Sequence, residues 1–409
     1  MLMRHRLLDI YRPICLLLIT LLTALLGLEA QSADYAPLRE GHWARLSVTR
    51  TGVHKVTFAA LREAGIENPA EVLEDNSLQL TPVPVYVADE AVYFYAMGMT
   101  EWIPELSQQT FRHQQNIYSN KGYYLATDRA DLPAQSIVVP QGAQQATETT
   151  VRTSFLAHVV HEEDRHSLRA SGRKLFGEPI GGHPLSVSLS LPTPLVPAAE
   201  GQLGVAYVGL PAKKETLELT AQLGGETYRD IIKRSEDGST STYLAGIYHA
   251  KRFATHLTSE AQSVEVQLQV SPAGRPAYLD YVTLVAPVAL QYGGKGQLAF
   301  RNFSATPGAI AEHRIGVTGS AGALQLWVRT AGGQVMSLPV AEQGGALTFT
   351  GTVTDGAGRP VEYTLFALTD AYPVEQVVAL SHGGVRLDTV PDYLMITTEA
   401  LRPAAERLA

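Results

Sequence analysis

Apolar and polar residues alternate in many short runs of the chain. In residues 185–191, Leu185, Val187, Leu189 and Leu191 alternate with three serines. Successive side chains of a strand point to opposite faces, so this pattern predicts a strand with one buried face. Runs of the same kind recur between residues 151 and 288 with turn signals between them. They predict a β-sandwich domain over residues 150–290.

The alternation continues in a later block with glycine-rich turns. The runs ALQLWVRT, ALTFTGTV and VEYTLFAL lie within residues 296–372. Short strands separated by such turns are typical of a sandwich, so we predict an immunoglobulin-like domain there.

The first part of the chain mixes strands with a helix. RLSVTRTGVHKVTF predicts two strands around Gly52, and TFAALREAGI predicts a short helix with Thr57 as N-cap and Gly65 at its end. PVYVADEAVYFYAMG predicts a hairpin that turns at residues 88–90. Residues 34–139 therefore form a predicted small α+β domain, and PQGAQQATETT connects it to the sandwich.

Aromatic residues cluster in the second strand of that hairpin. Alternation puts Tyr93 and Tyr95 on one face and Phe94 on the other. We favour packing of one face between neighbouring domains. Exposed tyrosines that bind carbohydrate or peptide are the alternative.

The last segment, PDYLMITTEALRPAAERLA, has a different pattern. Its apolar run, residues 393–396, is continuous and is followed by a polar break and the start of a helix. Such a run is typical of a parallel strand buried on both faces, which needs a neighbouring strand. We therefore expect residues 388–409 to begin an α/β domain that is truncated at Ala409. The predicted fold is otherwise mainly β.

The N-terminus has the features of a secretory signal. Arg4, Arg6 and Arg12 precede an apolar run, residues 14–28, that ends near Ala30. We predict a cleaved signal peptide over residues 1–30, with an uncleaved anchor as the alternative. We expect no transmembrane segment after cleavage, because a spanning helix needs roughly 20 apolar residues.

Composition narrows the possible chemistry. The single cysteine, Cys15, lies within the predicted signal peptide, so the mature chain is expected to have no thiol. The formal net charge of −8 gives no reason to expect a nucleic-acid partner. The glycine-rich pieces YGGKGQ and TDGAGRP match no phosphate or dinucleotide loop, and no G-x-S-x-G elbow occurs. We predict no cofactor and no catalytic residue.

The stretch HEEDRH resembles a zinc-protease motif with altered spacing. Two zinc ligands on one helix face need the pattern H-E-x-x-H, whereas His161 and His166 are five residues apart. In a strand, His158 and His161 would point to opposite faces. We predict no metal site. The alternatives are charged groups that cap a strand end or face a neighbouring domain.

Several stretches in the same order resemble one family, the PorU-like sortases of the type IX secretion system, which are gingipain-type cysteine peptidases. They are WARLSVTRTGVHKVTFAALREAGI, VYFYAMG with Trp102, NIYSNKGYYLAT, FLAHVVHEED, SLRASGRKLFGE, YLDYVTL, LAFRN, LFALTDAYPV and PDYLMITTEALRPAAERLA. The resemblance covers residues 41–409 nearly continuously. The chain departs from the family at Leu175, where tryptophan is expected, and has a shorter region before Val83.

The resemblance implies a function at the cell surface. Members of the family are exported to the outer membrane and cell surface, cleave C-terminal signal domains from secreted cargo through a catalytic cysteine, and attach the cargo to the surface. Type IX secretion components and cargo C-terminal domains are the implied partners. The catalytic histidine and cysteine of the family lie beyond residue 409, so the chain is expected to be a non-catalytic N-terminal region. Two alternatives are a secreted β-rich adhesin or carbohydrate-binding surface protein, and a metalloprotease built on His161.

Overall fold

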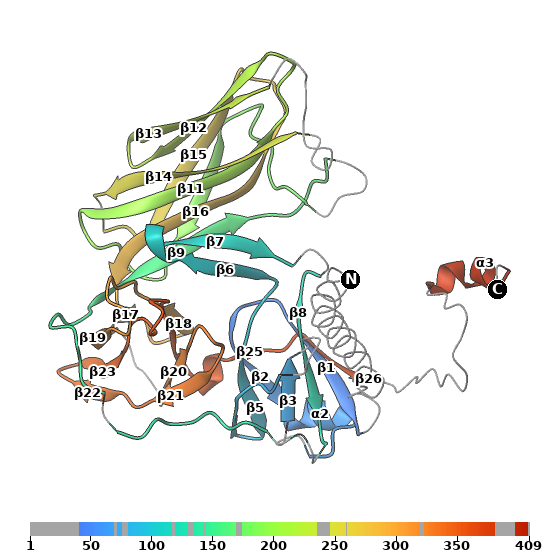
Figure 1. Cartoon of the computed structure of the whole chain (residues 1–409), viewed down its shortest axis with the longest axis vertical. Helices are drawn as coiled ribbons and strands as arrows, with labels where there is room; N and C mark the ends of the chain where they lie inside the picture. The colour runs from blue at the N-terminus through green and yellow to red at the C-terminus, as the bar shows by residue number, and fades with distance from the viewer. Residues whose placement is uncertain are drawn as a thin grey trace, which may run out of the picture.

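Most of the chain is described by the computed structural model. The described residues are 41–68, 72–75, 81–116, 119–129, 132, 134–142, 144–168, 174–234, 246–258, 260–318, 323–380 and 397–407, with the backbone alone for 72–75 and 399. Figure 1 shows three units, with a β-sandwich above and two smaller units side by side below it. The predicted signal peptide, residues 1–30, lies outside the described residues.

The first unit has two four-stranded sheets, with strand orders β26-β1-β8-β3 and β25-β2-β5-β4. Its strands are β1 (Trp43–Val48), β2 (Gly52–Thr57), β3 (Val72–Asp75), β4 (Val85–Ala88), β5 (Ala91–Ala96), β8 (Gly122–Thr127), β25 (Tyr372–Pro373) and β26 (Gln376–Leu380). The last two strands return to this unit from the far end of the described chain. A core of buried residues from both sheets and from α2 (Phe58–Glu63) lies within the unit.

Local sequence signals in the first unit are confirmed. The Thr57 side chain accepts a hydrogen bond from the Ala60 backbone N–H and caps α2, and Gly65 follows the helix with a φ of 88°. Strands β4 and β5 form the predicted antiparallel hairpin. The two strands around Gly52 also form, but they lie in different sheets, because β1 pairs with β8 and β26 while β2 pairs with β5 and β25.

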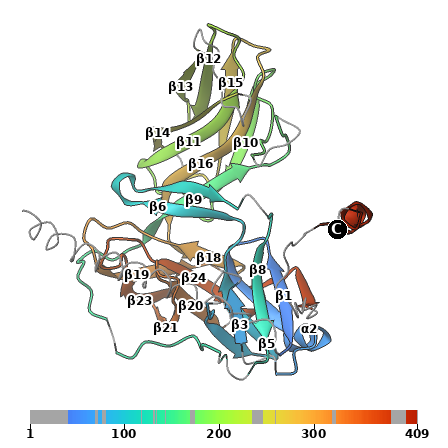
Figure 2. The ribbon, with the colours of Figure 1, turned by 45° about the vertical axis from the view of Figure 1, so that its right-hand side comes forward.

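A two-stranded hairpin extends from the first unit toward the sandwich. It consists of β6 (Thr100–Glu105), the 3-10 turn η3 (Leu106–Gln108) and β7 (Thr110–Gln115). Figures 1 and 2 both show this hairpin under the sandwich, beside strand β9 (Ser154–Glu162). The hairpin therefore brings residues of the first unit to the base of the second.

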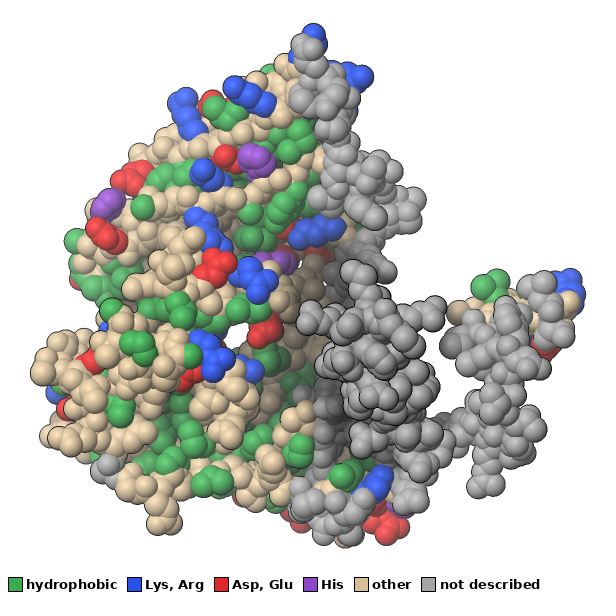
Figure 3. Space-filling model, in the orientation of Figure 1, with side chains coloured by type: hydrophobic (Ala, Val, Ile, Leu, Met, Phe, Trp, Pro, Cys, Tyr) green, Lys and Arg blue, Asp and Glu red, His purple; other side chains and the backbone are tan. Residues whose placement is uncertain are grey.

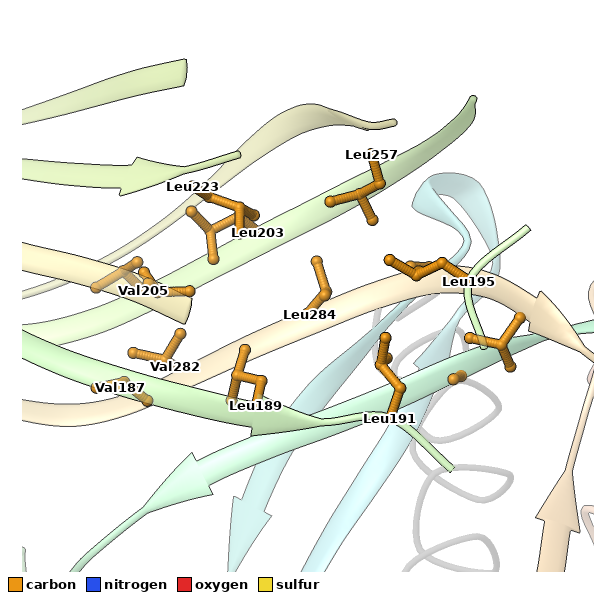
Figure 4. Packing of buried hydrophobic residues seen from close by; sticks show 14 of the residues in the cluster. Val187, Leu189, Leu191, Leu195, Leu203, Val205, Leu223, Leu257, Val282 and Leu284 are labelled. Atoms are coloured by element: carbon orange, nitrogen blue, oxygen red, sulfur yellow. The ribbon is translucent and has the colours of Figure 1, made fainter. Parts of the chain in front are cut away.

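The sandwich unit has two antiparallel four-stranded sheets, with orders β10-β15-β12-β13 and β14-β11-β16-β9. Besides β9, its strands are β10 (Leu185–Ser190), β11 (Ala199–Gly209), β12 (Thr216–Leu223), β13 (Glu226–Lys233), β14 (Ile247–Leu257), β15 (Ser263–Ser271) and β16 (Ala277–Ala289). Figure 4 shows aliphatic side chains from both sheets meeting between them. Val187, Leu189 and Leu191 are buried in that layer, as the alternation predicts.

The third unit is a smaller sandwich with sheet orders β17-β19-β23-β22 and β18-β24-β20-β21. Its strands are β17 (Gln291–Tyr292), β18 (Gln297–Phe300), β19 (Ile310–Val317), β20 (Leu324–Arg329), β21 (Val335–Leu338), β22 (Ala341–Gln343), β23 (Ala346–Thr352) and β24 (Glu362–Ala367), with η4 (Leu368–Asp370) after the last. Its buried residues form one continuous cluster with those of the sandwich unit. The two sandwiches thus share a packed boundary, which limits hinge motion between them.

The predicted mainly β fold is confirmed, with a helix in the first unit and sandwiches after it. The apolar run near Leu394 lies outside the described residues. Beyond it are η5 (Glu399–Leu401) and α3 (Arg402–Ala405), so the expected start of an α/β domain stays a prediction. Among the described residues, no helix is long and apolar enough to cross a membrane.

Candidate functional site at the junction of the three units

The HEEDRH stretch lies where the hairpin meets the sandwich. His161 and Glu162 end β9, and the residues after them leave the sheet. Because β9 is extended, its side chains divide between the two faces. The face of His158 and Glu162 is turned to the β6–β7 hairpin, and the face of His161 is turned away from it.

An aromatic cluster joins the hairpin to the sandwich. We call it the aromatic junction: Trp102, Phe111 and His113 from the hairpin, with His158 of β9 and Tyr281 of β16. The Trp102 ring centroid lies 4.4 Å from that of His158 and 5.3 Å from that of Tyr281. Phe111 lies 4.6 Å from His158, centroid to centroid. Edge-to-face contacts of this kind add to the stabilisation that burial provides.

Burial sets the charge of the histidine at the centre of this cluster. Loss of hydration lowers the pKa of His158 to about 3, and the positive charge of Arg301 and the neighbouring His113 act in the same direction. His158 is therefore a neutral ring near pH 7. It packs as an aromatic group and carries no charge in this state.

Beside the aromatic junction, carboxylates of β9 contact the hairpin. His113 Nε2 lies 2.9 Å from Glu162 Oε1, and Gln115 donates a hydrogen bond to Asp164 Oδ2. Burial raises the pKa of Asp164, and the negative charges of Glu162 and Asp280 add to that rise. Glu162 and Asp164 thus face a neighbouring unit, as one of the two sequence interpretations holds, whereas Glu163 pairs with Arg165 within the stretch.

The family-like segment KLFGE packs against the opposite side of HEEDRH. His161 Nε2 lies 2.8 Å from Glu178 Oε1. Burial raises the pKa of Glu178, but hydrogen bonds from the Glu178 backbone N–H and from His161 outweigh it and lower that pKa. Phe176 is fully buried, and a Cβ at Gly177 would lie 2.9 Å from the Glu163 carbonyl oxygen. Each residue of the aromatic-glycine-glutamate motif therefore has a packing role.

The lysine of the same segment compensates a buried carboxylate. Lys174 Nζ lies 2.8 Å from Asp280 Oδ2, and the Tyr248 hydroxyl donates to the same oxygen at 2.8 Å. The pairing of β11 with β16 skips Asp280, because Ala206 is opposite Tyr281 and the next residue is opposite Leu279. A bulge here interrupts the alternation at Asp280, whose side chain is buried, and a buried carboxylate is tolerated only when it is paired.

The three histidines His158, His161 and His166 are not brought together. His158 lies in the aromatic junction, His161 pairs with Glu178, and the His166 ring lies 5.6 Å from Tyr278. In the described part of the chain, no three His, Cys, Asp or Glu side chains form a group that could hold a metal ion. The geometry gives no support to a metalloprotease built on His161.

Tyr93 and Tyr95 are buried between the first and third units. They share an apolar cluster with Trp327 and Phe366, and Phe94 on the other face is buried in the core of the first unit. The interpretation as packing between domains is confirmed. Tyr93 and Tyr95 are 4% and 6% exposed, so they are not the exposed tyrosines that the carbohydrate- or peptide-binding alternative requires.

Sequence reasoning missed the partners that complete the junction. Trp102 and Tyr281 belong to family-like stretches, but nothing in their spacing shows that they touch. The alternation in FRHQQ is a usable signal, since it places Phe111, His113 and Gln115 on one face of a strand. These three side chains reach His158, Glu162 and Asp164 in the same order.

Replacing Trp102 with alanine should lower the free energy of unfolding by about 2 kcal/mol. The indole is half-buried and contacts three rings, so its loss removes packing and leaves a void. Urea unfolding followed by circular dichroism measures the change. Leu106→Ala, in the exposed turn of the same hairpin, is the matched control and should change stability by less than about 0.5 kcal/mol. Equal stability of the two variants would contradict the role given to Trp102.

Comparisons with solved structures find an extensive match. No family model matches the chain, and no curated protein sequence matches it. The crystal structure of dimeric latent PorU from Porphyromonas gingivalis superposes with a TM-score of 0.77 at 23% identity, and covers 92% of this chain. The chain spans 36% of the length of that protein.

Other solved structures match only loosely. One is an insecticidal delta-endotoxin, Cry8Ea1 from Bacillus thuringiensis, with a TM-score of 0.23 at 10% identity. That superposition covers 61% of this chain and 54% of the endotoxin chain. Another is a glucuronidase of family GH115, with a TM-score of 0.20 at 13% identity. That superposition covers 37% of this chain and 19% of the glucuronidase chain. The superposition on PorU shows that the chain has a PorU-like fold, so the resemblance inferred from sequence is confirmed at the level of fold.

Proposed function

We propose that this PorU-like chain is the non-catalytic N-terminal region of a type IX secretion sortase. In its full-length form, such a sortase cleaves C-terminal signal domains from secreted cargo and attaches the cargo to the cell surface. The superposition on PorU over 92% of this chain, against 36% of that protein, is the observation that carries the proposal. Type IX secretion components and cargo C-terminal domains are the proposed partners, and the outer membrane and cell surface the proposed location.

The chemistry of the chain supports a non-catalytic role. Acyl transfer by a cysteine peptidase needs a thiolate activated by a neighbouring base. The single cysteine, Cys15, lies in the predicted signal peptide. The unusual side chains at the junction, such as neutral His158 and paired Glu178, are used in packing one unit on another. We infer that the region positions other parts of a sortase and performs no chemistry itself.

The purified chain should not cleave a peptide that carries a cargo C-terminal signal. Mass spectrometry of the peptide after prolonged incubation measures this. A Cys15→Ala chain is the matched control, because any thiol chemistry would disappear with it. Cleavage by the unmodified chain would contradict the proposal, and its loss or survival in the Cys15→Ala chain would show whether the thiol is responsible.

An antibody raised against the chain tests the larger protein independently. Intact cells should expose an antigen whose mass exceeds that of a chain of 409 residues. An antigen of smaller mass, or one confined to the cell interior, would contradict the assignment. The alternative, a secreted β-rich adhesin or carbohydrate-binding surface protein, would instead give a surface antigen with the mass of this chain.

A further inference from the structure

A polar cleft opens where the three units meet, on the side of the aromatic junction that faces the third unit. It encloses about 380 Å³, within the usual range of small-ligand sites. Residues from all three units line it: the start of β6, His158 and Val160 of β9, and the ends of strands in the third unit. Figure 3 shows a hollow at this level of the molecule with Lys, Arg, Asp and Glu side chains around it.

Positive charge exceeds negative charge along the cleft wall. Arg301, Arg329 and Arg359 line it, against Glu101 and Glu362. His158 adds no charge near pH 7, since burial lowers its pKa to about 3. The whole chain has a formal net charge of −8, whereas this wall brings three arginines together beside two glutamates. An anionic ligand would meet a favourable field here.

Two of the arginines are already engaged by carboxylates. Arg301 Nη2 lies 2.8 Å from Glu362 Oε2, and its guanidinium stacks 4.7 Å from the Phe111 ring centroid. Arg359 binds Asp355 Oδ2 through both Nε and Nη2 at 2.8 Å. Both arginines contribute positive charge to the cleft, but the N–H groups that contact these carboxylates are not free to bind a ligand.

Arg329 is the arginine whose donors remain available. Its guanidinium lies 5.4 Å from the Tyr95 ring centroid, and its Nη2 donates to Met97 Sδ at 3.1 Å. Among the described residues, no carboxylate lies within ion-pair distance of it. Its cross-strand neighbour Glu362 instead accepts from Arg301 and from the Tyr95 hydroxyl. The Met97 thioether is a weak hydrogen-bond acceptor, so a carboxylate would bind the planar guanidinium group of Arg329 more strongly than Met97 does.

We propose that this cleft binds an acidic peptide segment, with the guanidinium of Arg329 donating paired hydrogen bonds to a carboxylate. Trp102, Ile103, Pro104, Val160 and Pro360 supply apolar surface next to the arginines. That combination suits a peptide, whose backbone and apolar atoms would contact these side chains, better than a free inorganic anion. The inference goes beyond the proposed function and does not depend on it.

Fluorescence anisotropy with a labelled peptide tests the site in the full chain. The probe is a hexapeptide in which aspartate alternates with alanine, and its control has asparagine in place of aspartate. The aspartate peptide should bind, the asparagine peptide should bind at least about tenfold more weakly, and added salt should weaken binding. Equal binding of the two peptides, or no binding of the first, would overturn the proposal.

Substitution of Arg329 locates the site. Arg329→Gln should weaken binding about tenfold or more, and Arg329→Lys, which keeps the charge but not the fork, should weaken it several-fold. Arg229→Gln, an exposed charge loss on β13, is the matched control and should stay within about twofold. Circular dichroism and thermal melting check that each variant folds.

Unchanged affinity in a folded Arg329 variant would overturn the proposal. A separate titration adds inorganic phosphate to the complex of the chain and the labelled peptide. If phosphate displaced the peptide at an equal concentration, the cleft would be a simple oxyanion site and the peptide assignment would be wrong.

Discussion

Acidification from about pH 7 to about pH 5 should lower the free energy of unfolding by about 4 kcal/mol through two buried histidines. The first is His158 in the aromatic junction, whose pKa burial lowers to about 3. The second is His313 of β19, which stacks on Phe349 with ring centroids 4.6 Å apart. Burial lowers its pKa to about 4, although its hydrogen bond to the Ala311 carbonyl opposes the shift.

The direction of this pH effect follows from the number of protons that the folded and the unfolded chain bind. Above the usual histidine pKa of about 6.5, both the folded and the unfolded chain keep these rings neutral. Below it, the unfolded chain binds protons that the folded chain excludes, so stability falls by about 1.4 kcal/mol per pH unit for each ring. The loss continues until the pH reaches the folded pKa values near 3 and 4. Each ring therefore contributes about 2 kcal/mol between about pH 7 and about pH 5.

Urea unfolding at a series of pH values, with and without each histidine, measures the effect. His158→Phe keeps an aromatic ring in the junction and cannot titrate, so its stability should depend less on pH than that of the unmodified chain. His183→Phe, at an exposed position, is the matched control and should keep the pH dependence of the unmodified chain. The account of His158 would be wrong if both variants had the same slope.

Removal of the returning strands should destabilise the first unit by about 3 to 5 kcal/mol. A chain that ends at Asp370 lacks β25 and β26, whereas a chain that ends at Leu380 keeps both. Strand β26 pairs with β1 over five positions, from Trp43 opposite Leu380 to Ser47 opposite Gln376. Its loss leaves the backbone of β1 unpaired on one side and exposes part of the core.

Side chains of the returning strands add to this stabilisation. Val374 and Val377 pack on the core of the first unit. Glu375 accepts a hydrogen bond from Thr49 Oγ1 at 2.7 Å and pairs with Lys121 Nζ at 2.8 Å. The valines should account for most of the side-chain effect, because an exposed ion pair contributes little and apolar burial contributes more.

Hydrogen exchange separates a local effect from a global one. In the chain that ends at Asp370, the amides of β1 and β8 should exchange faster, while those of the sandwich unit should keep their protection. The chain that ends at Leu380 is the control and should exchange like the full chain. Equal protection of β1 in the two shortened chains would show that the first unit folds without its returning strands.

The sequence by itself determined the local structure and the class of fold. Alternation identified many strands of the two sandwiches, because a sheet with one buried face imposes a period of two on its residues. Thr57 and Gly65 marked the ends of a helix through short-range hydrogen bonding and backbone geometry. The collinear family-like stretches anticipated the PorU-like fold that the superposition shows.

Only the tertiary structure decided which of these elements meet. No local pattern shows that β26 completes the sheet of β1, or that Arg329 and Trp102 line one cleft, since such contacts join residues hundreds of positions apart. The same holds for HEEDRH: its histidine spacing already spoke against a metal site, but only the structure shows that Glu162 pairs with His113 of the hairpin and His161 with Glu178. A side chain's protonation and role depend on its surroundings in space, and those are set by packing between units.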